Sequence, residues 1–157
     1  MKLRLNKPAK SLFIIALLSF PIAIWGAKIP ASPEKLEKQA DLVVTGKVIS
    51  ITSKIGKSKI ETSPGLHRDE VFTIKILVST VKKGAGVKSG DQIEIAVWKP
   101  VKRIPQVPGL QGHQPVPAKG DTATFFLKGK VGMLLEPILP NGISIAKPLP
   151  AKPKAIK

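Results

Sequence analysis

Apolar and polar residues alternate in several short segments of this chain, and no segment of helical length separates them. In "EVFTIKILVST" every second residue is apolar at Phe72, Ile74, Ile76 and Val78. This two-residue period is typical of a strand with one buried face. A parallel sheet needs crossover connections of a dozen or more residues, which are usually helical. The pattern therefore predicts a small barrel or sandwich rather than an α/β sheet.

Further segments extend this pattern in both directions. "DLVVTGKVISIT" has apolar residues on both faces around Gly46, which predicts a bulged, curved strand packed on either side. The other predicted strands are "DQIEIAVW", "DTATFFL", "VGMLLE" and "PNGISIA". "SPEKLEKQAD" predicts one short helix, with Ser32 as N-cap and Pro33 at the first helical position. The expected fold class is mostly β: a small five- to six-stranded barrel with one short N-terminal helix.

Two similar turns each precede a strand. "KSGD" at residues 88–91 and "AKGD" at residues 118–121 share a glycine followed by an aspartate. We interpret them as equivalent turns in which the glycine supplies a positive φ.

The two ends of the sequence differ from the middle in composition. Basic residues precede the apolar run "SLFIIALLSFPIAIW", and small residues follow it at Gly26 and Ala27. Residues 1–27 are therefore predicted to be a secretory signal peptide. The uncharged run is at the lower edge of the roughly 17–25 residues that span a membrane, so an uncleaved anchor is the alternative. The predicted domain is residues 28–146, and residues 147–157 form a basic, proline-rich tail. Either interpretation of the first segment predicts an exported protein of the periplasm, cell envelope or extracellular space.

The composition excludes several kinds of chemistry. The sequence has no cysteine, so it has no disulfide, thiolate metal site or cysteine nucleophile. The formal net charge is +16, which favours anionic polymers or membrane surfaces and also keeps a protein soluble. Beyond the signal segment the aromatic residues are few: Phe72, Trp98, Phe125 and Phe126. Two of these fall on apolar strand faces, which argues against nucleic acid as the partner because single strands need aromatic stacking platforms.

No catalytic motif stands out. In "GLHRDE" a His67–Asp69 pair is formally available, but no serine signature supplies a nucleophile, and the segment is predicted to be a polar turn. The carboxylates that could form a glycosidase pair have no selective spacing. They are Glu61, Asp69, Glu70, Asp91 and Asp121. We expect a non-enzymatic protein without a cofactor.

The stretch "VPGLQGHQPVPAKGD", residues 107–121, includes most of a long predicted loop from Lys99 to Lys119, and long loops without secondary structure are more often functional than idle. Its His113 has only His67 as an imidazole partner, which is too few ligands for a zinc site. The loop and the basic tail are the predicted binding surface for a protein or an anionic envelope polymer. Its candidate residues are Lys99, Lys102, Arg103, Gln111, His113, Gln114, Lys119, Lys147, Lys152 and Lys154. The alternative is a small exported enzyme or metal-dependent protein centred on His113.

The run "QADLVVTGKVISI", followed by "VKKG", "GDQIEIAVW" and "KGDTATFFLK", resembles secreted bacterial domains with an OB-like barrel. This architecture is shared with netrin modules and the tissue inhibitors of metalloproteinases. The resemblance covers about Pro33 to Ala146 and implies an OB-like barrel. The inhibitors chelate zinc through an amino-terminal cysteine that this chain lacks, so the resemblance does not imply protease inhibition.

Overall fold

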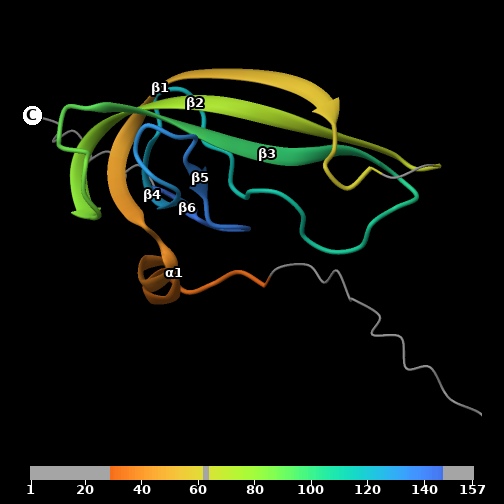
Figure 1. The fold of residues 1–157 in the computed structure, drawn as a ribbon, viewed down its shortest axis with the longest axis horizontal. Coiled ribbons are helices and arrows are strands. Elements are labelled where there is room, and N and C mark those ends of the chain that lie inside the picture. The colour runs from red at the N-terminus through yellow and green to blue at the C-terminus, as the bar shows by residue number, and fades with distance from the viewer. Residues whose placement is uncertain (1–28, 62–63, 147–157) are drawn as a thin grey trace, which may run out of the picture.

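The chain folds into one antiparallel sheet with a short helix packed against it (Figure 1). The computed structural model describes residues 29–61 and 64–146. In chain order the elements are α1 (Pro33–Gln39), β1 (Leu42–Lys57), β2 (Leu66–Lys83), β3 (Gln92–Ile104), β4 (Thr122–Lys128), β5 (Glu136–Pro137) and β6 (Ile143–Ile145). The prediction of a mostly β protein with one short helix is confirmed. The predicted signal segment and tail lie outside the described residues.

The sheet is open. Its strand order is β3-β2-β1-β4-β5, and β6 pairs with β4. Between β3 and the segment before β5 there is one isolated bridge, Ile95 to Leu135, where the Ala96 N–H donates to the Leu135 carbonyl at 2.8 Å. The described strands therefore do not close into the expected barrel. The physical reason lies in the predicted strand "VGMLLE": its first part is a turn in which the Met133 N–H donates to the Lys130 carbonyl, and only Glu136 at its end belongs to a strand, β5.

Strand β1 is bulged, as predicted. Its pairing with β2 shifts register between Val43 and Val44, between Thr45 and Gly46, and between Val48 and Ser50. At Gly46 the two strands approach so closely that a Cβ atom would lie 2.6 Å from the Leu77 carbonyl oxygen. The absence of a side chain at this position permits the close approach.

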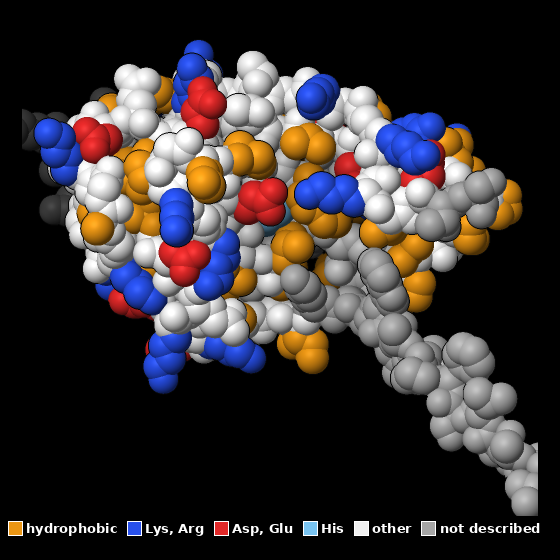
Figure 2. Space-filling view, in the orientation of Figure 1, with side chains coloured by type: hydrophobic (Ala, Val, Ile, Leu, Met, Phe, Trp, Pro, Cys, Tyr) orange, Lys and Arg blue, Asp and Glu red, His pale blue; other side chains and the backbone are white. Residues whose placement is uncertain are grey.

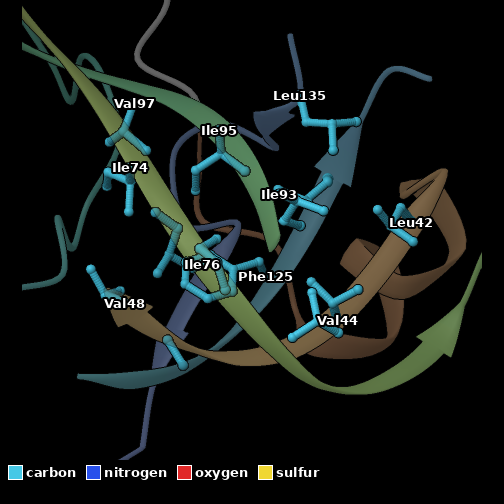
Figure 3. Close-up of a cluster of buried hydrophobic side chains, with 14 of the residues drawn as sticks. Leu42, Val44, Val48, Ile74, Ile76, Ile93, Ile95, Val97, Phe125 and Leu135 are labelled. Atoms are coloured by element: carbon cyan, nitrogen blue, oxygen red, sulfur yellow. The ribbon is translucent and has the colours of Figure 1, made fainter. Parts of the chain in front are cut away.

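The main core lies between the curved strands (Figure 3). Its side chains come from the alternating apolar positions of β1, β2, β3 and β4, together with Leu135 and Ile143. A second, smaller cluster lies on the other face of the sheet, where Leu36 of α1 and the C-cap residue Ala40 cover Val43 and Phe126. The N-cap of α1 is formed as predicted, with the Ser32 Oγ accepting from the Lys35 N–H at 3.4 Å. The first part of β1 is therefore buried on both faces.

The two predicted turns have the same geometry. Gly90 and Gly120 both adopt positive φ, at 90° and 96°. The following residues, Asp91 and Asp121, each accept a backbone N–H three residues back at 2.8 Å. Each turn also holds the neighbouring strand, because Gly90 donates to the Val78 carbonyl and Gly120 to the Val48 carbonyl.

Strands β1, β2 and β3 extend past the compact end of the molecule as a three-stranded arm (Figure 1). We define the arm as residues 53–57, 66–72 and 98–104. Strand β4 does not reach it, because β4 pairs with β1 only from Leu42 to Lys47. Two predictions for this region are wrong. "GLHRDE" is mostly part of β2 rather than a turn, and residues 99–104 belong to β3 rather than to a loop. Pro100 is accommodated because β3 is an edge strand.

Candidate binding surface

Residues 105–119, here called the proline loop, connect β3 to β4 and lie along the edge of β3. The loop is close to the strand at Gly112, where a Cβ atom would lie 2.6 Å from the Trp98 carbonyl oxygen. The Gln114 N–H donates to the Pro140 carbonyl at 2.8 Å. The predicted loop is therefore held at several points by backbone contacts.

His113 is buried and connects the proline loop to β3 and β5 by hydrogen bonds. Its side chain is only 1% exposed, and its backbone N–H donates to the Trp98 carbonyl at 2.8 Å. The Nδ1 atom accepts from the Trp98 N–H at 3.1 Å, so the ring proton is placed on Nε2, which lies 2.9 Å from the Pro137 carbonyl oxygen. Both ring nitrogens therefore contact the backbone, and the imidazole lies nearly perpendicular to the Trp98 ring, with 6.1 Å between the ring centres. This geometry favours a structural role for the imidazole.

Arg103 is also engaged inside the molecule. Its guanidinium pairs with Asp69, donates from Nε to the Gln111 Oε1 at 2.8 Å and donates from Nη1 to the Arg68 carbonyl at 2.9 Å. Gln111 donates in turn to the Val107 carbonyl at 2.9 Å. The side chain of Arg103 is 9% exposed, so this network joins the proline loop to the arm rather than facing solvent.

The His67–Asp69 pair does not have the geometry of a triad. Both residues are buried, and they lie two positions apart on the same face of β2. Asp69 is paired with Arg103, and within the described part of the chain the His67 Nδ1 has no hydrogen-bond partner. An aspartate that orients a catalytic histidine must accept from its ring, and this one does not.

The face of the arm opposite His67 and Asp69 carries alternating charged and apolar side chains. Paired residues of a sheet share a face, and the register joins Ile55 to Glu70 and Lys99, Lys57 to Arg68 and Lys102, and Leu66 to Ile104. We call this set of side chains the open face. Its members are Ile55, Lys57, Leu66, Arg68, Glu70, Lys99, Lys102 and Ile104.

Glu70 on the open face and Glu61 beside it both form ion pairs with basic side chains. Glu70 lies 3.1 Å from the Lys99 Nζ and accepts from the Ser53 hydroxyl at 2.8 Å; the hydroxyl and then the lysine lower the pKa of this carboxyl. Lys99 also lies 5.0 Å from the centre of the Phe72 ring. Glu61 lies in the connection between β1 and β2, here called the tip of the arm, and it pairs with Arg68 and with Lys57. The pKa of Glu61 is lowered mainly by the His67 backbone N–H, with further contributions from the two cations.

The structure brings together only some of the predicted site residues. Lys99, Lys102, Arg103 and Gln111 lie on or against the arm, whereas His113 and Gln114 lie further along the β3 edge. Lys119 belongs to the second glycine turn, next to Val48. Lys147, Lys152 and Lys154 lie outside the described residues. Whether these side chains bind a ligand stays a prediction.

Sequence reasoning missed Lys57 and Arg68 as members of a basic surface. Both lie outside the predicted loop from Lys99 to Lys119, and Arg68 falls in a segment predicted to be a turn. The signal that could have found them is the alternation Leu66, Arg68, Glu70, Phe72, which continues the period of the buried strand residues.

Within residues 29–61 and 64–146, no group of three or more potential metal ligands comes together. In the same ranges, no helix is long and apolar enough to cross a membrane. Comparisons of the chain with models of protein families, with curated proteins and with solved structures each gave no match.

Proposed function

We propose that the protein is an exported, non-enzymatic module that binds an anionic polymer of the cell envelope through the open face of the arm. One observation carries this proposal: the carboxylates on and beside this face form ion pairs within the protein, and the basic side chains there outnumber them. Lys57 and Arg68 share Glu61, and Lys102 has no ion pair among the described residues. Such a surface attracts polyanions.

Two further observations support a binding role rather than catalysis. The His113 ring is buried, and both of its nitrogens are within hydrogen-bond distance of backbone groups. Asp69 forms an ion pair with Arg103. An enzyme centred on His113 would need an accessible ring nitrogen. Export is supported by the basic and apolar order of the first residues of the sequence.

An OB-like relationship of the fold is part of the same proposal. The strong curvature and bulges of β1 support it, as does the Ile95–Leu135 bridge, which lies where a closing ladder would form. The likeness to netrin modules suggests only this architecture.

The test measures the affinity of the full chain for a soluble polyanion, with heparin and polyphosphate as probes. The arm variant Lys57→Gln with Lys102→Gln is compared with Lys35→Gln with Lys38→Gln on α1, which removes the same charge elsewhere. We expect binding at about 50 mM salt, where screening is modest, and a steep loss at higher salt. The arm variant should weaken binding by about tenfold, and the helix variant by less than about twofold. Equal effects of the two variants, or no binding at low salt, would reject the proposal.

A further inference from the structure

We infer that the open face of the arm docks on the surface of an anionic phospholipid bilayer, with Ile55 and Ile104 entering the interfacial region. The inference rests on the proposed function for its basic side chains, and it adds a ligand that the isoleucines would recognise. It assigns the arm a peripheral contact in which no part of the arm spans the bilayer.

The first step is the exposure of the two isoleucines. Ile55 is 62% exposed and Ile104 is 51% exposed, and they lie on the outer strands of the arm with β2 between them. Leu66, the partner of Ile104 on the same face, is only partly buried. Figure 2 shows apolar and basic side chains side by side at the end of the molecule where the arm lies. Along β2 their partners Glu70 and Leu66 lie four positions apart, so the two exposed isoleucines stand at the two ends of a row of basic side chains on one face.

The second step is the charge around these side chains. Lys57, Arg68, Lys99 and Lys102 share the face with the isoleucines, and the carboxylates of the tip are matched by ion pairs. Basic side chains beside aliphatic ones are the combination with which proteins lie on anionic membranes: the cations meet the head groups, and the aliphatic groups enter the boundary with the acyl chains. A soluble polyanion would use only the cations. The isoleucines are therefore the reason to add an anionic bilayer to the ligands of this face.

The absence of cysteine from the sequence gives a direct test. In the full chain, Ile55→Cys accepts a single environment-sensitive dye, and Met133→Cys gives a matched control, because Met133 is 71% exposed and lies outside the arm. Each labelled protein is mixed with vesicles of phosphatidylglycerol and phosphatidylcholine, with vesicles of phosphatidylcholine alone, and with heparin. We expect a blue shift and a rise in intensity at position 55 with the anionic vesicles only, and no such change at position 133. Because each dye reports its own position, contacts made elsewhere in the chain do not produce this result.

The outcomes separate the two proposals. If heparin binds but the dye at position 55 stays in water on anionic vesicles, the bilayer inference is wrong and the polymer proposal stands. If the dye changes equally with heparin and with vesicles, the face recognises soluble polyanions and the inference is overturned. If neither ligand binds, both proposals fail.

An unlabelled comparison guards against an effect of the dye. Ile55→Ser with Ile104→Ser should lower partitioning onto anionic vesicles by about tenfold or more, because two aliphatic side chains no longer leave water. The same variant should leave heparin affinity within about twofold, since it removes no charge. Met133→Ser with Leu134→Ser, at a second exposed apolar site, should leave both unchanged. Equal vesicle partitioning of the arm variant and the parent chain would overturn the inference.

Discussion

The His113 imidazole links the edge of β3, the proline loop and β5 through its two ring nitrogens. Replacing it with alanine would leave a cavity and would strip partners from the Trp98 N–H and the Pro137 carbonyl. We expect His113→Ala to lower the free energy of unfolding by about 3 kcal/mol, from cavity formation and unpaired backbone groups together. Urea denaturation followed by circular dichroism measures this change.

The neighbouring exposed residue provides the control for that measurement. Gln114→Ala removes a side chain from the same loop, and the backbone bond from Gln114 to Pro140 is kept. Its effect should stay within about 0.5 kcal/mol. If His113→Ala unfolds at the same urea concentration as Gln114→Ala, the ring does not stabilise the fold.

The importance of His113 could be suspected from the sequence, but its structural role could not. Its position in a loop rich in proline and glycine suggested an exposed ligand. The structural role depends on Trp98, 15 positions away, whose backbone N–H points outward from the edge strand and needs a partner. Local residue patterns do not report where an edge strand finds that partner.

At the level of elements, the curvature of β1 depends on the close approach at Gly46. A methyl group there would meet the Leu77 carbonyl oxygen at 2.6 Å and the Ile76 side chain at 2.5 Å. We expect Gly46→Ala to destabilise the protein by about 2 kcal/mol, because a closely packed interior does not absorb an added methyl group. The measurement is again the midpoint and slope of urea denaturation.

The same strand contains a matched control in its arm portion. At Gly56 an added Cβ atom would meet nothing within 4 Å. Gly56→Ala should therefore be neutral or stabilise slightly, since it only reduces the freedom of the unfolded chain. If both substitutions destabilise the protein equally, any added side chain at a glycine of β1 lowers stability. The close approach of β1 to β2 at Gly46 is then not the cause.

The periodicity of the sequence predicted the existence of most elements but not their lengths. Strands β2 and β3 continue beyond the apolar alternation, and in this extension the ion pairs Glu70–Lys99 and Asp69–Arg103 join the two strands. The segment "VGMLLE" is only partly a strand: its first residues form a turn, whereas Leu135 makes the bridge to Ile95 and Glu136 begins β5. The helix and the glycine turns were located well, because capping and positive φ are properties of a few adjacent residues.

For the whole molecule, the total charge could be read from the sequence, whereas its distribution could not. Arg103 and Asp69 are 34 positions apart, and only the pairing of β2 with β3 brings them together. This ion pair removes Arg103 from the predicted binding surface as a free cation, while Lys57 and Arg68 join the open face through the pairing of β1 with β2. A candidate surface inferred from one loop therefore contained only part of the basic region.

Two basic regions could carry the contact with a polyanion, the arm and the tail with Lys147, Lys152, Lys154 and Lys157. They can be separated by the dependence of heparin affinity on salt, because each cation that neutralises an anionic group releases a counterion. We expect Lys57→Gln with Lys102→Gln to lower the slope of log affinity against log salt by about two, and deletion of residues 147–157 to lower it by less. Lys102→Gln is preferred to any change at Arg103, because loss of the Arg103 guanidinium would leave Asp69 buried without its partner. A larger loss of slope on deleting the tail would place the contact there and leave the arm without this role.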